Sequence, residues 1–563
     1  MDTLIRDDQQ LETLVGHFYA WEKAKPGAVF LRQPSGDAFL DFTWADVGQQ
    51  ARRMATYLNS LGLPPHSTIG LVSKNCAHWL IADIAIMMSG HVSVPFYPTL
   101  TAPQLQQVLE HSECRVLFVG KLDGWETVKA GVPASIHKIA FPTYDPSGAS
   151  VDAEAAQWNT ILASHDPLMG NPLPAGQDIS TIIYTSGTTG NPKGVMLTYH
   201  ALHAVMSKTK EQMRHDVAEP RFFSYLPLCH IAERNVVEAT SLVTGGTVYF
   251  AESLETFAKN LAVARPTHFL AVPRIWTKFQ MGILAKLPQA KLDRLLRIPI
   301  ISSLVKRKIR QGLGLNDAKL IITGAAPMPL ALIQWFRRIG IVIQEAYGMT
   351  ENMGAVSMMP ADNIKDGTVG RVNEGMHIRV DPQTGEIQTR ADWNMLGYYR
   401  EPALTAATIK DGWLYTGDVG EVDSEGFLHI TGRVKEMYKS PKGEYIAPAQ
   451  IEFGFADNNH IEQVCVTGQQ LPQPIALIVL SDMARQADRH IVAQGLQQTL
   501  DVLNERVHSY ERVRKLIVVK EPWTVENNIM TPTMKMKRNI IDARYGPQYE
   551  PWFGREEVIV WED

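Results

Sequence analysis

Short apolar runs alternate with segments of helical periodicity along most of the chain. Five of the runs have the length and composition of buried strands, and they occupy residues 68–75, 114–120, 178–185, 318–324 and 340–348. Strands that are apolar throughout are typical of sheets covered on both faces, whereas half-exposed strands alternate apolar and polar residues. The pattern therefore predicts an α/β fold with largely buried sheets.

The apolar stretch at residues 78–97 is not predicted to span a membrane. It contains Asp83, His91 and a Ser89-Gly90 break, whereas a span needs about 20 mainly apolar residues. We expect a buried helix that runs into a core strand. The amino-terminal sequence MDTLIRDDQQ is charged and lacks the apolar core of a signal peptide, so export is not expected.

Length and composition indicate a globular protein of more than one domain. A chain of 563 residues is too long for a single hydrophobic core. Its formal net charge of -5 offers no general attraction for nucleic acid, so nucleic-acid binding is disfavoured. The four cysteines are far apart and fit free thiols in a reducing compartment, which favours a cytoplasmic enzyme. They are Cys76, Cys114, Cys229 and Cys465.

The character of the chain changes at about Gly432. Residues 432–452 are dense in charged and turn-forming residues, and a second series of strand-like and helical segments follows them. We therefore expect a domain boundary near Arg433 to Lys435. The two expected domains cover residues 1–432 and 433–563.

The sequence YTSGTTGNPKGVML at residues 184–197 has the composition of an anion cradle. Its spacing differs from G-x-x-x-x-G-K-[ST] and both of its flanks look like strands, so it is not a Walker phosphate loop. Glycines in a turn expose backbone N–H groups, hydroxyls add donors, and a lysine adds positive charge. An ordinary surface turn uses the same residue types, so composition alone leaves both interpretations open. The candidate residues are Thr185, Ser186, Gly187, Thr188, Thr189, Gly190 and Lys193.

As a whole, this string resembles the phosphate-binding signature of the adenylate-forming superfamily, which includes acyl-CoA synthetases, luciferases and the adenylation domains of peptide synthetases. Further signatures of that superfamily follow in the expected order: GAAPMP at 324–329, EAYGMTE at 345–351, the block at 411–436 and TPTMKMKR at 531–538. PLCHIAERN at 227–235 and KGEYIAPAQIE at 442–452 look most like long-chain fatty acyl-CoA synthetases. The resemblance covers roughly residues 25–545.

The resemblance implies that the first domain binds the nucleotide. An aromatic face stacks on a base, a carboxylate is a hard oxygen ligand for magnesium, and a carboxylate can accept from both hydroxyls of a ribose. The implied positions are Gly324, Ala325 and Ala326 on the adenine side, Tyr347 and Gly348 against adenine, Thr350 near the α-phosphate, Glu351 toward Mg2+, and Asp418 and Arg433 at the ribose.

The same resemblance implies that the second domain carries the catalytic lysine. The register of the motif favours Lys535 over Lys537. Lys435 matches the hinge between the domains, and Gly443 and Glu444 match a segment of the tunnel for CoA.

His230 matches a residue at the junction of the acyl pocket and the CoA tunnel, where we expect an orienting or gating role. A metal role for His230 with Glu233 is compatible with their spacing, but no third ligand is evident.

The implied fold is α/β, with a large multi-sheet N-terminal domain whose sheets are packed with helices and a small, mobile α+β C-terminal domain. The implied reaction uses Mg2+ and ATP to activate a medium- or long-chain fatty acid as an acyl-adenylate, and then transfers the acyl group to CoA. The products are acyl-CoA, AMP and pyrophosphate. Three alternatives stay open: a fatty acyl-AMP ligase that serves a carrier protein, a luciferase-like oxygenase, and a silent nucleotide- or acyl-binding regulator.

Two further segments have open interpretations. Residues 288–315 carry basic side chains among leucines and isoleucines, which suits peripheral contact with anionic lipid at the inner face of a membrane. A solvated helical hairpin that covers the core fits the same pattern. Residues 546–563 mix aromatic and acidic side chains, and they either pack as a final strand or stay loose.

Overall fold

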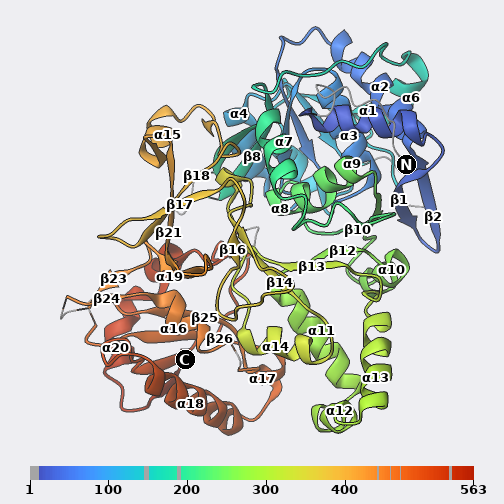
Figure 1. Ribbon diagram of the computed structural model, residues 1–563. Coiled ribbons are helices and arrows are strands. Elements are labelled where there is room, and N and C mark those ends of the chain that lie inside the picture. The colour runs from blue at the N-terminus through green and yellow to red at the C-terminus, as the bar shows by residue number, and fades with distance from the viewer. Residues whose placement is uncertain are drawn as a thin grey trace.

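The computed structural model describes residues 12–144, 151–186, 192–440, 443–456, 458–469, 471–525, 527–531 and 535–562. Three sheets lie in the amino-terminal part of the chain, and a small sheet with its own helices lies in the carboxy-terminal part (Figure 1). The eight-stranded sheet and its helices form the upper part of Figure 1, the nine-stranded sheet crosses the middle, and the carboxy-terminal elements lie at the lower left. The predicted α/β fold with a large multi-sheet part and a small carboxy-terminal part is confirmed.

The eight-stranded sheet contains the first three predicted strand runs. Its central strands are parallel, and β3 and β4 are buried at every position, as expected for a sheet covered on both faces. The strands in spatial order are β19 (Gly397–Tyr398), β9 (Pro192–Thr198), β8 (Ile179–Ser186), β4 (Val92–Phe96), β3 (Thr68–Val72), β5 (Val116–Val119), β6 (His137–Ala140) and β7 (Ala156–Gln157). Strands β8 and β9 are the two flanks of the glycine- and threonine-rich motif, and they pair antiparallel with Thr185 opposite Lys193.

The nine-stranded sheet carries the next two motifs at the carboxyl ends of neighbouring parallel strands. Its strands in spatial order are β16 (Arg371–Val372), β15 (Ser357–Met358), β14 (Gln344–Tyr347), β13 (Leu320–Thr323), β12 (His268–Leu270), β10 (Arg221–Ser224), β11 (Thr247–Phe250), β1 (Val29–Ser35) and β2 (Ala38–Thr43). Only residues 344–347 of the predicted run 340–348 pair as a strand. Ile341 and Ile343 are also buried, but they lie in the connection between a helix and this strand.

A third sheet and the carboxy-terminal sheet complete the strands. The third sheet contains β17 (His377–Val380), β18 (Glu386–Arg390), β20 (Ile409–Lys410), β21 (Trp413–Val422) and β22 (Leu428–Arg433). The carboxy-terminal part contains a hairpin of β23 (Tyr438–Lys439) and β24 (Tyr445–Ile446) and a sheet of β25 (Ile461–Thr467), β26 (Ile475–Leu480), β27 (Lys515–Val518) and β28 (Ile559–Trp561). Strand β28 pairs parallel with β27, so the tail of the chain packs as a final strand.

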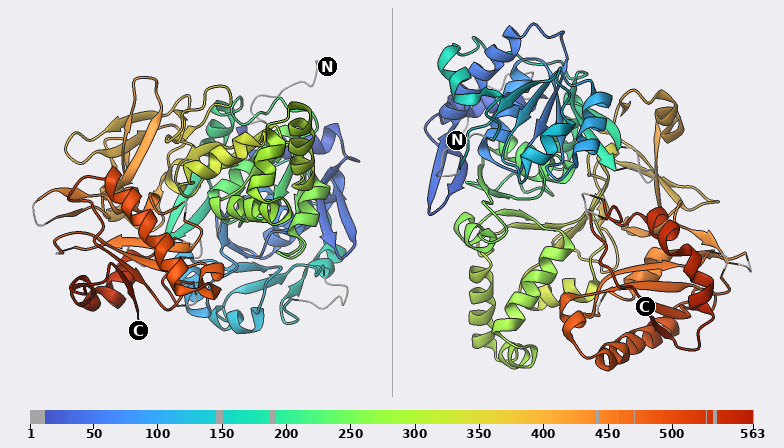
Figure 2. Two further views of the ribbon diagram at one scale, coloured as in Figure 1. Left: turned by 90° about the horizontal axis from the view of Figure 1, so that it is seen from below. Right: turned by 180° about the vertical axis from the view of Figure 1, so that it is seen from behind.

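The helices pack on the faces of these sheets (Figure 2). Those of the amino-terminal part are α1 (Leu14–Ala24), α2 (Trp44–Ser60), α3 (Ala77–Met88), α4 (Ala102–Ser112), α5 (Trp125–Val128), η2 (Lys129–Gly131), α6 (Trp158–Ser164), α7 (Tyr199–Lys208), α8 (Ile231–Glu233), the π-helix η3 (Arg234–Ala239), α9 (Thr240–Thr244), α10 (Phe257–Ala264), α11 (Pro273–Lys286), α12 (Gln289–Leu296), α13 (Pro299–Gly312), α14 (Leu330–Arg338), η4 (Thr350–Asn352) and α15 (Pro402–Thr408). Those of the carboxy-terminal part are α16 (Pro448–Phe453), α17 (Asp482–Gln486), α18 (Arg489–Arg506), α19 (Arg538–Tyr545), η5 (Gly546–Gln548) and α20 (Tyr549–Phe553).

Helix α3 explains the apolar stretch at residues 78–97. Every residue of the helix is buried, and Gly90 turns the chain into β4 with a positive φ of 72° that favours glycine. The expected buried helix that runs into a core strand is confirmed. Among the residues that the structure describes, no helix is long and apolar enough to cross a membrane.

Candidate active site

Asp418 and Arg433 face each other because the register of β21 and β22 pairs them. The Arg433 Nε–H donates to Asp418 Oδ1 at 2.8 Å, and the Tyr347 hydroxyl donates to Asp418 Oδ2 at 2.6 Å. Burial raises the pKa of Tyr347, and the Asp418 carboxylate adds to that shift, so Tyr347 stays a neutral donor. Three residues that the sequence assigned to adenine and ribose thus form one hydrogen-bonded group, which we call the nucleotide-side cluster.

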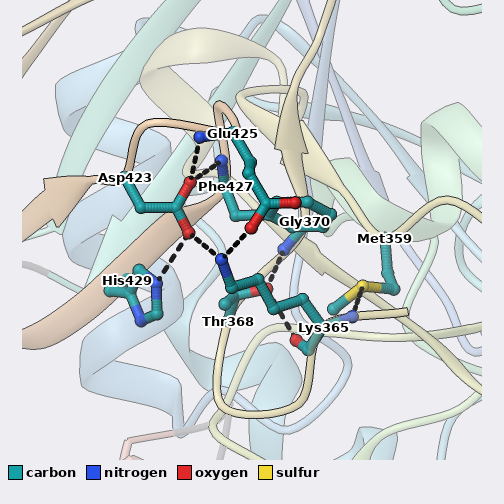
Figure 3. Close-up of polar contacts among 8 residues, drawn as sticks. All are labelled: Met359, Lys365, Thr368, Gly370, Asp423, Glu425, Phe427 and His429. Atoms are coloured by element: carbon teal, nitrogen blue, oxygen red, sulfur yellow. Dashed lines mark hydrogen bonds and ion pairs between the residues drawn. The ribbon is translucent and has the colours of Figure 1, made fainter. Parts of the chain in front are cut away.

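The hairpin that carries Asp418 and Arg433 is fastened to the connection between β15 and β16 (Figure 3). Asp423 accepts from the backbone N–H groups of Glu425 and Phe427, and its second oxygen lies 2.7 Å from Lys365 Nζ. The Lys365 ammonium holds the pKa of Asp423 well below its usual range. Leu428 N–H also donates to the Gly370 carbonyl. These contacts fix one end of the strands that present the cluster.

Glu351 lies on η4, directly after the strand that carries Tyr347. Its Oε1 accepts from the Tyr398 hydroxyl at 2.8 Å, and its backbone carbonyl accepts from Met395 N–H. Burial raises the pKa of the Glu351 carboxyl, although Tyr398, Lys193 and Arg433 favour its charged form. Thr350 beside it is also buried. Two oxygen-bearing side chains therefore lie together next to the nucleotide-side cluster.

Lys193 approaches the same group from β9. Its ammonium lies 5.4 Å from the centroid of the Tyr398 ring, within reach of a cation–π contact. Burial lowers the pKa of Lys193, the Lys435 ammonium adds to the shift, and Glu351 opposes it. Thr185 and Ser186 end β8 opposite β9, whereas Gly187, Thr188, Thr189 and Gly190 lie outside the described residues.

The backbone comes unusually close to itself beside Tyr347. A Cβ on Gly324 would lie 2.9 Å from the Ala346 carbonyl oxygen, and one on Gly348 would lie 2.2 Å from the Gly354 carbonyl carbon. Ala325 adopts a φ of 66°, a conformation that is uncommon without glycine and that concentrates at functional sites. Ala325 and Ala326 are exposed. Position 324 therefore requires glycine. The small residues Ala325 and Ala326 that follow it leave the backbone accessible from solvent.

Lys535 comes to the nucleotide-side cluster from the carboxy-terminal part of the chain. Burial lowers its pKa and Arg433 adds to the shift, whereas Asp418 and Glu351 oppose it. The residue as a whole is exposed. Lys537 differs, because its Nζ donates to Asn528 Oδ1 at 2.5 Å within the carboxy-terminal part.

The segment that carries Lys535 is anchored by Arg538, which the sequence did not single out. One Arg538 amine donates to both oxygens of Glu452 at 2.7 and 2.6 Å, and its Nε lies 3.2 Å from Glu436. Glu436 belongs to the turn 434–436 that follows β22, in which Lys435 is exposed and Glu436 is half-buried. Arg538 thus connects the expected hinge turn with the lysine segment. Arg538 and Glu436 both lie within motifs of the sequence. Arginine and glutamate are also common in surface ion pairs, so nothing in the local sequence marked these two as partners.

His230 lies at the edge of this group. Its Nδ1 accepts from the Ala232 N–H at 3.2 Å, which leaves the ring proton on Nε2. Burial lowers the pKa of His230 to about 4, and the Lys535 ammonium adds to the shift.

Glu233, three residues on, turns into the core. Its Oε1 accepts from the Ser224 hydroxyl and the Tyr225 N–H, both at 2.9 Å. Burial raises its pKa to about 8. No set of three His, Cys, Asp or Glu side chains in the described part of the chain is placed to hold a metal ion.

Gly443 and Glu444 lie on the exposed turn of the β23–β24 hairpin, where Gly443 has a φ of 84°. Gly443 N–H donates to the Ser440 carbonyl. No interaction recorded for the described residues joins this turn to the nucleotide-side cluster, so the structure brings Lys535, but not this turn, to the cluster.

Comparisons with known proteins match nearly all of the chain to adenylate-forming enzymes. Residues 18–399 match the AMP-binding enzyme family, and residues 440–556 match the AMP-binding enzyme C-terminal domain. The chain is 30% identical to "Long-chain-fatty-acid--CoA ligase FadD15" of Mycobacterium bovis, over 95% of this chain and 96% of that protein. It is 28% identical to "Fatty acyl-CoA synthetase A" of Dictyostelium discoideum, over 90% of this chain and 85% of that protein.

Solved structures share the fold. An anthranilate CoA ligase in complex with anthranoyl-AMP superposes with a TM-score of 0.76 at 20% identity, over 96% of this chain and 98% of that chain. A Mycobacterium tuberculosis fatty acyl CoA synthetase superposes with a TM-score of 0.65 at 22% identity, over 96% and 99%. The resemblance stated from the sequence is confirmed: the chain belongs to the AMP-binding enzyme family of the adenylate-forming superfamily and is an adenylate-forming enzyme related to acyl-CoA synthetases.

Proposed function

We propose that this protein ligates a medium- or long-chain fatty acid to CoA at the expense of ATP, with acyl-adenylate as the intermediate. The observation that carries the proposal is the electrostatic interaction of Lys535, from the carboxy-terminal part of the chain, with Arg433, Asp418 and Glu351. The names of the full-length relatives support a fatty acid and CoA as substrates.

In the first step the fatty carboxylate attacks the α-phosphorus of ATP, an O–P bond forms, and the bond to pyrophosphate breaks. Asp418 accepts hydrogen bonds from the ribose, Arg433 holds Asp418, and the exposed edge at Ala325 and Ala326 receives adenine beside Tyr347. Lys535 and Lys193 offset the charge on the phosphates. One such pair at about 4 Å contributes roughly 4 kcal/mol at an effective dielectric of about 20, against about 1 kcal/mol in water.

The residues present fit a magnesium ion. Magnesium prefers oxygen ligands, and Glu351 and Thr350 offer a carboxylate and a hydroxyl side by side. Tyr398 orients the carboxylate through Oε1. When bound, the ion supplies further positive charge against the triphosphate.

In the second step the CoA thiol attacks the acyl carbonyl, a C–S bond forms and AMP leaves. We assign the domains to residues 1–432 and 433–563, with rotation at Lys435 withdrawing Lys535 and bringing Gly443 and Glu444 to the tunnel for CoA. His230, neutral at physiological pH, orients the acyl group through its Nε2–H. The four cysteines are free and buried, which supports a reducing compartment such as the cytoplasm.

The proposal is tested by supplying the purified chain with ATP, Mg2+, CoA and fatty acids from acetate to oleate. AMP, pyrophosphate and CoA thioester are quantified separately. We expect equal amounts of all three products with medium- or long-chain acids. Absence of acid-dependent AMP across the panel contradicts the proposal, and adenylate without thioester assigns the chain instead as a fatty acyl-AMP ligase.

A further inference from the structure

The helices α12 and α13 form a hairpin at the lower end of the molecule, beside α11 (Figures 1 and 2). It lies on the nine-stranded sheet's side of the amino-terminal part, and Leu292 and Ser302 are its buried residues. The rest of the hairpin surface is half-buried or exposed. The sequence alone left this segment as either a solvated cover or a lipid-binding surface.

The net charge of residues 273–315, which include α11 and the hairpin, is opposite in sign to that of the whole chain. Residues 273–315 hold ten Lys and Arg residues and one acidic residue, Asp293, in a chain whose formal net charge is -5. The rest of the chain is therefore strongly acidic, and the positive charge is concentrated here. The basic residues are Arg274, Lys278, Lys286, Lys291, Arg294, Arg297, Lys306, Arg307, Lys308 and Arg310.

Large apolar side chains stand among these cations in solvent. Ile300 is 78% exposed and Leu304 is 55% exposed, and Ile298 and Ile301 beside them are also exposed. Ile300, Leu304 and Arg307 or Lys308 follow one another at helical spacing, so they share the outward face of α13. The face is apolar toward the tip of the hairpin and basic farther along the helix. Single exposed apolar side chains are ordinary, whereas the stretch 298–304 exposes four of them together.

A recess of about 370 Å³ lies between α12, α13 and α14. It is lined by Asp293, Leu296, Arg297, Lys306 and Arg338. Arg338 is paired with Asp293 at 2.5 Å. Arg297 also faces the Asp293 carboxylate and helps to lower its pKa, and the ion pairs recorded for the described residues include none for Lys306. The recess therefore holds three cations, Arg297, Lys306 and Arg338, against one carboxylate.

We propose that this face docks the enzyme on a bilayer that contains anionic phospholipid. Ile298, Ile300, Ile301 and Leu304 enter the interface, where they leave water. Arg307 and Lys308 lie against the anionic surface, and the recess at Arg297 and Lys306 receives a headgroup phosphate. Anionic lipid is the occupant that matches both the cations and the apolar tip, because an acidic soluble protein would leave the isoleucines in contact with polar groups. The inference does not depend on the proposed substrate.

The test is flotation of the full chain with vesicles of phosphatidylglycerol and phosphatidylcholine, and with vesicles of phosphatidylcholine alone. At about 0.1 M salt, where the Debye length is about 10 Å, we expect binding to the anionic vesicles only. The variant R307E/K308E should bind at least about tenfold more weakly, because each basic residue near such a surface contributes a several-fold factor. The matched control R506E/R512E reverses two exposed arginines in the carboxy-terminal part and should bind like the wild type.

Two further variants separate the parts of the surface. I300S/L304S keeps every charge and should lose binding. R297Q/K306Q should bind the anionic vesicles several-fold more weakly and keep the preference for phosphatidylglycerol, because Arg307 and Lys308 remain. Inorganic phosphate should not displace the protein from vesicles. AMP-forming activity without vesicles and the thermal unfolding midpoint should stay at the wild-type level, which excludes misfolding.

Equal vesicle binding by the wild type and R307E/K308E contradicts the proposal. It is also contradicted if light scattering shows a wild-type dimer that I300S/L304S converts to a monomer while vesicles bind neither, because the face is then an interface between two copies.

Discussion

The nucleotide-side cluster and the segment that carries Lys535 interact electrostatically but are built in different ways. Tyr347, Asp418 and Arg433 project from three strands, and each is hydrogen-bonded to a partner on a different strand. Lys535 lies outside the described helices and strands and is held locally by two hydrogen bonds with Thr531. Strand register thus fixes the first region ahead of the hinge proposed at Lys435, whereas the position of Lys535 depends on where the chain after that hinge sits.

This difference predicts that the two regions can be separated by mutation. A defect in the cluster should impair both half-reactions, because AMP is part of the substrate of each. A defect in the lysine segment should impair adenylate formation alone.

Lys535→Ala should lower fatty-acid-dependent exchange of pyrophosphate into ATP by about a thousandfold. The lost interaction of roughly 4 kcal/mol corresponds to about three factors of ten. Lys537→Ala is the matched control, because Lys537 is bonded to Asn528 away from the cluster. Exchange at the wild-type rate in Lys535→Ala, or an equal loss in Lys537→Ala, would show that the wrong lysine carries the charge.

Asp418→Asn should lower kcat/KM for ATP by roughly 10- to 100-fold, because hydrogen bonds to charged groups contribute about 1.5–3 kcal/mol. Both half-reactions should fall together, measured as pyrophosphate exchange and as thioester formation from synthetic acyl-adenylate. Tyr347→Phe keeps the ring, loses one bond to Asp418 and should have a smaller effect. A defect of Asp418→Asn that is confined to one half-reaction contradicts the comparison.

The pH dependence of adenylation should report Lys535 and not His230. Protonated Lys535 is the active form, so the rate is retained below its pKa and lost as pH rises through it, by about tenfold for each further pH unit. Because that pKa is lowered, the alkaline limb should lie below 10.5. Lys535→Arg should move the limb to higher pH if it retains activity.

His230, with a pKa of about 4, stays neutral near pH 6.5 and should contribute no limb there. The profile of kcat/KM for pyrophosphate exchange checks both statements. A limb near pH 6.5 that vanishes in His230→Gln contradicts the second.

Glu436→Gln should lower adenylation by about fivefold, because a partly exposed ion pair contributes up to about 1 kcal/mol. The change loosens Arg538 from the hinge turn while its bonds to Glu452 remain. Thioester formation from synthetic adenylate should be unchanged. The control is Glu421→Gln, which changes an exposed glutamate on β21 and should leave both rates unchanged. Equal effects of the two substitutions would contradict the proposal that Arg538 couples the hinge turn to the lysine segment.

The sequence predicted the parts of the site that depend on local pattern. Apolar runs predicted β3, β5, β8 and β13, because buried parallel strands need no polar alternation. The glycine that begins the motif at 324–329 indicated a close backbone approach, and a Cβ on Gly324 would indeed meet the Ala346 carbonyl. The register of the motif favoured Lys535 over Lys537, and that choice stays a prediction.

The partners that hold the site could not be predicted in this way. Tyr398 reaches Glu351 across 47 positions of the chain, and Arg538 reaches Glu452 across 86 positions. Such pairs follow from how sheets and domains pack, and hydrophobic periodicity carries no information about which distant polar residues meet. Lys365 and Asp423 are a further case, since each looks like an ordinary surface charge until the hairpin is docked.

The most direct test of the separation supplies synthetic acyl-adenylate and CoA to the Lys535→Ala variant and measures thioester formation in a single turnover. If Lys535 serves only the first half-reaction, the rate should match that of the wild type. A loss as large as the loss in pyrophosphate exchange would contradict the account, because the lysine would then act in both steps and no exchange of domain positions would be needed.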